Sequence, residues 1–536
     1  MRMSLSLRTF LRPLRTAALF VLAVAGPFEA ARATDLSDVL RDAMTNDPKI
    51  GAARAGFLAR NEIVAQSRSA LLPQISAGGS NQDIRRQSLR ASFPGQDLES
   101  FFNQTQWQAE FRQPLLAAAD YFTLRSAQAQ RDAARNDLNA SEQELLLRVS
   151  TAYFDVLRAQ DQLDSATAEE TAVKRQLEQV QQRFEVGLVA ITDVLESQAV
   201  YDNAVVRRIQ ADGDHDIVFE NLRTLTGKSY QSLERLALAL PIVYPEPRNE
   251  EAWVEQAMGG SYKIRSAQDT LLASQRDVRA RKSAHLPTID AVANYSEFRT
   301  GSSSSFGDSD SRTYSLEARV PIFQGGLVSS RVREGEYRTE QASQQLEDQR
   351  RTVARDTRNL YLQVITDVVR VRAGEKSIQS SKAALEATQT GYEVGTRNIV
   401  DVLQAQQRLY QAQFTYADSR YAYVTDLLRL KQSVGSLQPQ DIDELNTFLT
   451  DKEMVSQLPI DRLYQDNPTS TVPISPPGPA PAPAKPKTPA KGTPSTEQRE
   501  RGADPTRPSQ DIEVAPDAKL SEEVLAPSAV EQAESP

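Results

Sequence analysis

The stretch of sequence that decides the fold occurs twice in the chain. Residues 184–198 read FEVGLVAITDVLESQ, and residues 392–406 read YEVGTRNIVDVLQAQ. Eight positions are identical at one constant separation, among them Gly187 and Gly395. In each copy a helical pattern ends at the glycine and a new one begins a few residues later, which predicts a helix-turn-helix tip. A chain with two such tips contains two long helical hairpins.

The segments on either side of each tip lack helix breakers over unusual lengths. Residues 115–186 contain neither Gly nor Pro, and Glu, Gln, Ala, Arg and Leu dominate them. About 70 residues of helix extend roughly 100 Å, which is longer than a compact globular domain can cover. The pattern predicts extended helices that pack along a narrow apolar seam, over residues 115–186, 192–225, 327–394 and 400–434.

Four shorter segments alternate apolar and polar residues with a period of two, which is typical of half-exposed β-strands. They are predicted over residues 74–80, 104–113, 289–295 and 312–320, and a polar loop is expected between the first two through about residue 103. In the clearest strand Trp107, Ala109 and Phe111 share one face. Trp107 and Tyr295 are candidates for an aromatic girdle at a membrane boundary, and simple packing explains either one equally well.

A proline stands at each junction between an alternating segment and a helix. Pro73 corresponds to Pro287 in the second half of the chain, and Pro114 corresponds to Pro321. The two separations in sequence are nearly equal, and both are close to the separation of the two tips. Because proline fixes φ and removes a backbone donor, it suits a change from strand to helix. We predict that the four prolines form a swivel between the strands and the helices. Four ordinary helix breakers would explain each proline singly but not the matched spacing.

The matched spacings divide the chain into two repeats with unlike ends. Arginines, a short apolar run and small residues at a cleavage position predict a signal peptide, since the run is shorter than the ~20 residues of a membrane anchor. The Pro-rich end cannot bury enough apolar surface to fold, and we interpret it as a dispensable extension rather than a ligand for a partner domain. The predicted organisation is a signal peptide (1–33), a first repeat (34–227), a connector (228–250), a second repeat (251–435), an equatorial segment (436–452) and a disordered tail (453–536).

The composition argues against catalysis. The 536 residues include no Cys and only two His, His215 and His285, and they contain neither a Gly-rich phosphate loop nor HExxH spacing. We therefore expect no enzymatic activity, no cofactor, no metal site and no nucleic-acid partner. No apolar run after residue 34 is long enough for a spanning helix. The mature chain is then either soluble in the periplasm or inserted in a membrane as β-strands.

The strand count bears on assembly. Four strands cannot close a barrel, and an open sheet edge is forbidden in hydrocarbon, so membrane insertion requires several protomers to pool their strands. Two protomers would supply eight strands, whose interior side chains fill, whereas three would supply twelve strands around a water-filled lumen. The residues alone leave three and four protomers open.

The two tips VGLVAITDVL and VGTRNIVDVL, framed by these elements, resemble the periplasmic tips of TolC-family outer-membrane efflux proteins, over roughly residues 36–450. The resemblance implies an α+β membrane protein of the cell outer membrane, a homotrimer with a 12-stranded β-barrel continued by a helical coiled-coil barrel. It implies an exit duct for efflux or type I secretion, served by a periplasmic adaptor (membrane fusion) protein and an inner-membrane efflux or ABC-type pump. The alternative is a soluble periplasmic coiled-coil scaffold, which the two-faced strands disfavour.

The resemblance also implies a latch that keeps the duct shut. Asp193 would meet the hydroxyl of Tyr392, and Arg397 would bridge to Thr192 and to a neighbouring protomer. A few bonds worth ~1.5 to 3 kcal/mol each, repeated in three subunits, reach the ~5.5 kcal/mol that reverses a two-state equilibrium. Ordinary helix caps and surface pairs are the alternative explanation, since Thr192 and Asp193 suit a helix start.

Two further sites at the tips follow from the resemblance. Asp401 matches an acidic position at the narrowest point of the entrance, but Gln404 stands where a second Asp is often found, so this entrance should be less acidic. Small or apolar residues at an exposed turn fit a docking site for the helical hairpins of the adaptor. The expected docking residues are Val186, Gly187, Leu188, Val394, Gly395 and Thr396.

Overall fold

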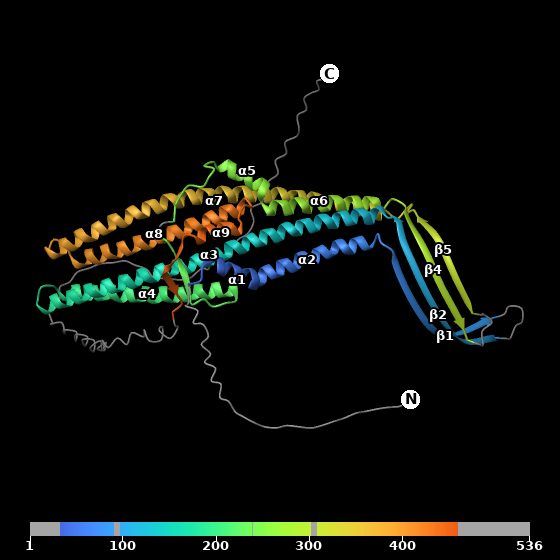
Figure 1. Ribbon diagram of the computed structural model, residues 1–536, viewed down its shortest axis with the longest axis horizontal. Helices are drawn as coiled ribbons and strands as arrows, with labels where there is room; N and C mark the ends of the chain where they lie inside the picture. The colour runs from blue at the N-terminus through green and yellow to red at the C-terminus, as the bar shows by residue number, and fades with distance from the viewer. Residues whose placement is uncertain (1–32, 90–96, 238–239, 302–307, 459–536) are drawn as a thin grey trace, which may run out of the picture. The chain divides into compact units, whose positions relative to one another are not determined.

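The computed structural model describes residues 33–89, 97–237, 240–301 and 308–458 (Figure 1). The predicted signal peptide, except for its last residue, and the chain after residue 458 lie outside these ranges. The helices are α1 (Leu36–Asn46), α2 (Pro48–Ser69), α3 (Ala118–Glu185), α4 (Ile191–Thr226), α5 (Glu250–Gly260), α6 (Tyr262–Ser283), α7 (Leu327–Glu393), α8 (Ile399–Ser433) and α9 (Pro439–Asn446). The strands are β1 (Gln74–Leu89), β2 (Asp97–Leu116), β3 (Ser232–Leu236), β4 (Thr288–Thr300), β5 (Ser309–Arg319) and β6 (Leu449–Ser456).

Two helical hairpins of nearly equal size dominate the fold (Figure 1). Helices α3 and α4 have 68 and 36 residues, and α7 and α8 have 67 and 35. Each returning helix ends at a left-handed glycine, Gly227 after α4 and Gly435 after α8. The absence of Cβ makes this backbone conformation inexpensive for glycine. Within the described ranges, none of the helices is long and apolar enough to cross a bilayer.

A four-stranded antiparallel sheet in the order β1-β2-β4-β5 carries one apolar face. The register places Ile75, Phe111, Ala293 and Tyr314 in a single row across all four strands. Directly paired residues lie on the same face, so this row joins the apolar positions that alternation predicted on separate strands. The face is open to solvent in the protomer, since the exposed fractions are 78% for Ile75 and 81% for Tyr314.

The first two strands are longer than predicted, and the expected polar loop through residue 103 is wrong. In its place β1 and β2 pair over 16 positions, including Asn81 with Thr105 and Asp83 with Asn103. These pairs are polar, and the Asn103 amide donates to the Asp83 carboxylate over 2.8 Å. Because the extension carries no apolar alternation, sequence periodicity could not reveal it.

Three of the four junction prolines lie where strands meet helices. Pro73 and Pro287 come immediately before β1 and β4, and Pro321 follows β5. Pro114 was expected to end its strand, but β2 continues to Leu116 with a register shift between the two residues. A proline cannot donate to the ladder, so the irregularity falls where one donor is missing.

A small sheet of β3 and β6 lies where the repeats join. The connector prediction missed β3, and β6 extends to Ser456, past residue 452 where the tail was expected to begin. An isolated parallel bridge joins Thr34 to Leu233 of β3. Strands this short, paired with partners from distant parts of the chain, leave no local pattern in the sequence.

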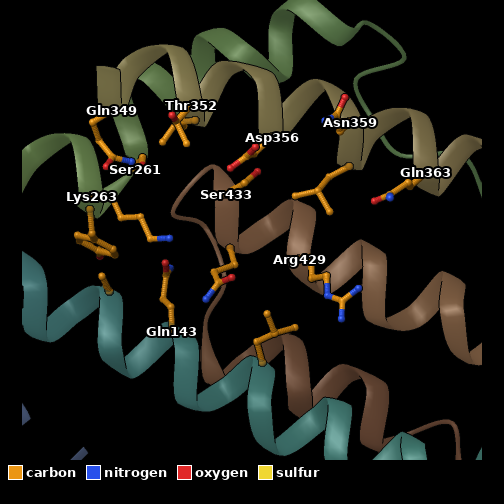
Figure 2. Close-up of a pocket in the computed structure, with 16 residues that line it drawn as sticks. Gln143, Ser261, Lys263, Gln349, Thr352, Asp356, Asn359, Gln363, Arg429 and Ser433 are labelled. Carbon is orange, nitrogen blue, oxygen red and sulfur yellow. The ribbon is translucent and has the colours of Figure 1, made fainter. Parts of the chain in front are cut away.

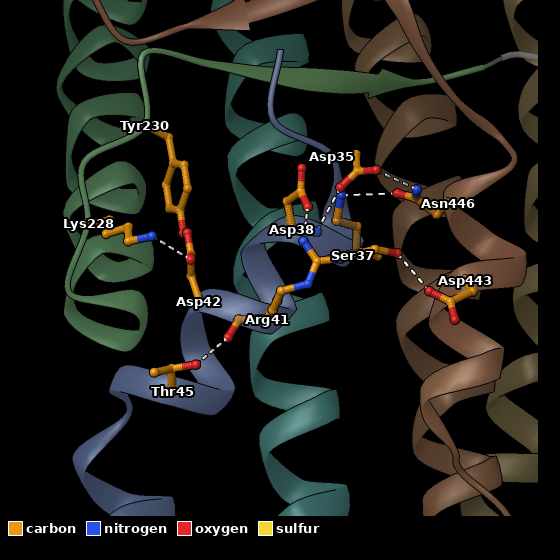
Figure 3. Close-up of polar contacts among 11 residues, drawn as sticks. Asp35, Ser37, Asp38, Arg41, Asp42, Thr45, Lys228, Tyr230, Asp443 and Asn446 are labelled. Carbon is orange, nitrogen blue, oxygen red and sulfur yellow. Dashed lines mark hydrogen bonds and ion pairs between the residues drawn. The ribbon is translucent and has the colours of Figure 1, made fainter. Parts of the chain in front are cut away.

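Polar contacts hold α1 between the end of the first repeat and α9 (Figure 3). Lys228 pairs with Asp42 at 2.6 Å, and the buried hydroxyl of Tyr230 donates to the same carboxylate. On the other side the Asn446 amide donates to Asp35 over 2.9 Å. The N-terminal helix thus joins the middle of the chain to the end of the second repeat.

Candidate functional site at the helical tips

Both tips turn through the same backbone motif. The Gly187 N–H donates to the Phe184 carbonyl, and the Leu188 N–H donates to the Arg183 carbonyl. In the second tip Gly395 and Thr396 repeat these two bonds, with φ of 79° at Gly395 and 76° at Gly187. This pair of bonds is the Schellman motif, which needs a left-handed residue after the helix. The glycine at each tip is therefore explained by the turn itself.

A buried apolar cluster holds the two hairpins together just behind the tips. Val173 and Val180 of α3 pack with residues at the start of α8, of which Ile399 is 1% exposed. The side chains of the cluster are Val173, Val180, Ile399, Val402 and Leu403, and Tyr392 lies against them. Because the cluster draws on both hairpins, the two tips are positioned as one unit.

Tyr392 lies at the contact between the two hairpins. Its hydroxyl is buried and has no hydrogen-bond partner among the described residues of the protomer. The guanidinium carbon of Arg183 lies 4.9 Å from the centre of its ring. Arg183 was not among the predicted site residues, since no local signal relates it to a ring at the end of the other hairpin. An unpaired buried hydroxyl is costly, so Tyr392 is a donor that still requires an acceptor.

The other predicted latch residues lie nearby but are not joined to Tyr392 within the described part of one protomer. Thr192 is exposed and Asp193 is half-buried in the first turn of α4, where the Asp193 carbonyl accepts from the Ser197 hydroxyl. Arg397 is exposed, with one guanidinium nitrogen 3.7 Å from the Asp401 carboxylate. The protomer thus brings together Arg183 with Tyr392 and Arg397 with Asp401.

The entrance residues occupy the first turns of α8. The Asn398 side chain accepts from the Asp401 N–H over 2.8 Å and caps the helix. Asp401 is half-buried, and Gln404, almost one turn later, is exposed. A carboxylate in the first turn also interacts favourably with the helix dipole, so a structural role accounts for part of the environment of Asp401.

The predicted docking residues are exposed at both tips. Val186, Leu188 and Val394 expose 70%, 73% and 69% of their surface. Gly187, Gly395 and Thr396 are exposed as well. Large apolar side chains gathered at the end of a hairpin are unusual for a free surface and mark interaction sites.

A family model described as outer membrane efflux protein matches residues 39–228 and 253–436, which include both hairpins and both tips. The chain belongs to the outer membrane efflux protein family. Its relatives include the outer membrane protein TolC of Vibrio cholerae, 35% identical over 80% of this chain and 98% of the relative. TolC of Escherichia coli is 31% identical over 80% of this chain and 88% of the relative.

Solved structures of outer-membrane channels share the fold of this family member. The Campylobacter jejuni CmeC channel covers 83% of this chain and 98% of its own length, with a TM-score of 0.65 at 16% identity. The CusC structure covers 80% of this chain and 99% of its own length, with a TM-score of 0.66 at 17% identity. The chain is therefore an outer-membrane channel protein, and members of its family serve efflux and secretion. The soluble scaffold considered as an alternative is therefore set aside.

Proposed function

We propose that three copies of the chain pool their sheets into a 12-stranded barrel in the outer membrane, continued by a tunnel of helices through the periplasm. The observation that carries the proposal is the exposed apolar face of a sheet whose outer strands, β1 and β5, each leave one edge unpaired within the described chain. An apolar face suits lipid, but unpaired edges do not. Pooling the sheets removes the edges and keeps the face.

The need for a lumen argues against two copies, and the family resemblance supports three. Three sheets give twelve strands, enough to enclose water, whereas eight strands are filled by side chains. Trp107 supports an outward-facing role for the apolar row: its ring covers Gly79, where a Cβ would approach to 2.7 Å, and 59% of Trp107 remains exposed. An aromatic ring over a strand glycine restores packing that the glycine lacks.

The tips then act as the gate of the duct. In the proposed closed state Asp193 accepts from Tyr392, whose buried hydroxyl lacks a partner among the described residues, and Arg397 reaches Thr192 and a neighbouring protomer. Arg397 is exposed and its contact with Asp401 is long, at 3.7 Å, so its side chain can reach across an interface. Asp401 and Gln404 line the entrance that the latch constricts.

Docking of a periplasmic adaptor opens the gate and connects the duct to an inner-membrane pump, either an efflux transporter or an ABC-type pump. The exposed turns with Val186, Leu188 and Val394 supply the docking surface. The names of the relatives include both protein secretion and export. AprF of Pseudomonas aeruginosa is named for alkaline protease secretion, at 27% identity over 77% of this chain, and OpmQ for pyoverdine export.

Disulfide trapping between protomers tests the assembly, since the native chain has no Cys. Ser80→Cys on β1 is combined in turn with Ser311→Cys, Thr313→Cys or Ser315→Cys on β5, because the register between protomers is to be found. Oxidation of membranes should give a ladder that ends at three covalently linked copies in at least one pair. Ser80→Cys alone is the control and should give no ladder beyond two copies. A ladder that ends at four copies, or none with any pair, would contradict the proposal.

A further inference from the structure

Two aspartates face each other across the second helical hairpin, far from the tips. Asp367 of α7 is 3% exposed, and the carboxyl of Asp426 on α8 lies within its hydrogen-bond reach. One oxygen of Asp367 is 3.2 Å from Arg370, and the other is buried with no hydrogen-bond donor in the described chain. The Asp426 carboxylate is 2.8 Å from Arg429.

Two ionised carboxylates can only accept, so they cannot form a hydrogen bond with each other. A proton on either one converts the contact into an O–H···O⁻ bond, which is short and strong. The same proton removes the repulsion and supplies the donor that the buried Asp367 oxygen lacks. We propose that Asp367 and Asp426 bind one proton between them and form an acid-responsive clamp between α7 and α8.

The electrostatic environment supports the clamp. Burial, and then the negative charge of Asp426, raise the pKa of Asp367 to about 6, while Arg370 opposes the rise. A carboxyl that shares a site with a second carboxylate is expected to behave in this way. Asp367 therefore changes its charge within the pH range of mildly acid surroundings.

Charges from neighbouring helices complete the environment. Helix α8 contributes Asp418, whose charge also raises the pKa of Asp367, and Arg158 of α3 pairs with Asp418 at 2.6 Å. Burial raises the pKa of Asp155 on α3, and Arg158 and Arg429 lower it. Helices α5 and α6 also form ion pairs with α7, but these pairs do not include Asp367. Glu251 of α5 pairs with Arg358, and Arg281 of α6 pairs with Glu334. The positive charges of the arginines offset the negative charges of the acids only in part, so the pKa of Asp367 stays raised.

A cavity is lined by residues that neighbour the pair, and neither aspartate lines it. The cavity, of about 440 Å³, lies among α3, α6, α7 and α8, and Gln363 and Arg429 line its end in Figure 2. Gln363 precedes Asp367 by one helical turn, and Arg429 is the partner of Asp426. Among the described residues no group of three or more His, Cys, Asp or Glu could hold a metal ion.

The direction of the effect follows from the raised pKa. The folded protein holds the proton more tightly than an unfolded carboxyl of pKa 3.8, so the stabilisation is complete below about pH 4 and is lost as the pH rises through about 6. Acid thus tightens α7 against α8, and α7 leads directly to the second tip. The clamp needs one protomer only and does not depend on the proposed trimer.

Hydrogen exchange of the full mature chain in detergent tests the clamp, with rates corrected for the intrinsic effect of pH. The wild-type segments around residues 360–370 and 420–430 should gain about tenfold protection at pH 5 relative to pH 7.5. Asp367→Asn removes the proton site and should abolish the gain. Asp356→Asn, on the exposed side chain paired with Arg355 in the same helix, is the matched control and should keep it.

A second variant and a second measurement guard against misfolding. Asp426→Asn should reduce the gain, because it removes the second carboxylate and leaves only burial to raise the pKa of Asp367. Infrared difference spectra at pH 5 should show less protonated-carboxyl C=O absorption in Asp367→Asn than in the wild type. A wild type without the gain, an unchanged gain in the two variants, or an unchanged carboxyl band in Asp367→Asn would overturn the proposal.

Discussion

The guanidinium of Arg183 lies 4.9 Å above the ring of Tyr392, so a cation–π contact joins the end of α3 to the end of α7. The two residues belong to different hairpins. Behind them the buried cluster with Val180 and Ile399 fixes the same interface. The position of Tyr392, and of the gate proposed around it, is therefore set by contacts between the hairpins as well as by its own helix.

Removal of the cation should loosen the tips. Arg183→Gln loses a contact worth about 0.5 to 1 kcal/mol per protomer at a partly exposed site, and we expect a higher single-channel conductance in planar bilayers. Arg125→Gln is the matched control, because Arg125 lies 5.2 Å from the ring of Tyr121 at the opposite end of α3. Equal conductance of the two variants would show that Arg183 plays no part in closure.

The latch itself predicts a larger effect. Tyr392→Phe combined with Arg397→Ser removes the buried hydroxyl and the exposed cation, and each lost charge-assisted bond is worth ~1.5 to 3 kcal/mol. Conductance should rise above that of Arg183→Gln. Tyr392→Phe alone separates the two contributions, since it keeps the ring beneath Arg183. Wild-type conductance in the double variant would exclude the latch.

A close approach of two backbones predicts a severe and local defect. A Cβ on Gly260, at the end of α5, would overlap the carbonyl oxygen of Val434 at the end of α8. Gly260→Ala should therefore lower the free energy of unfolding by several kcal/mol, because the new methyl group must displace backbone atoms. Gly259→Ala has open space and sits in the same helix, so it should be neutral or stabilising by up to about 1 kcal/mol. Similar melting temperatures for the two variants would contradict this packing.

The second tip offers a test of adaptor docking. Gly395 has φ of 79° with open space around it, so Gly395→Leu combines backbone strain with a bulky side chain at the turn. We expect loss of chemical cross-linking to the adaptor, with barrel assembly intact. Gly395→Asn tolerates the left-handed conformation and is the control for the turn itself. Normal cross-linking of Gly395→Leu would remove this residue from the docking surface.

Periodicity predicted the long helices well because their signals are local and repeated. Asp47 separates α1 from α2, and its carboxylate accepts from the Lys49 N–H and caps α2. The polar halves of β1 and β2 were missed because their pairing is carried by backbone bonds and by polar pairs such as Asp83 with Asn103. Strands β3 and β6 were missed because their partners are distant in sequence.

The candidate site divides in the same way. The signal for a turn is local in sequence, and Gly187 and Gly395 adopt the left-handed conformation at the predicted turns. The contact of Arg183 with Tyr392 and the facing of Asp367 with Asp426 arise from packing between helices, and neither pair stands out in the sequence. Contacts between helices depend on the relative rotation of each, which composition and spacing do not encode.

The proposed duct requires an assembly of three chains. Native mass spectrometry of the processed protein, released from a mild detergent, measures the number of copies directly. We expect a species of three chains that dissociates to single chains on boiling. A single chain, or a stable assembly of another number, would contradict the proposed assembly.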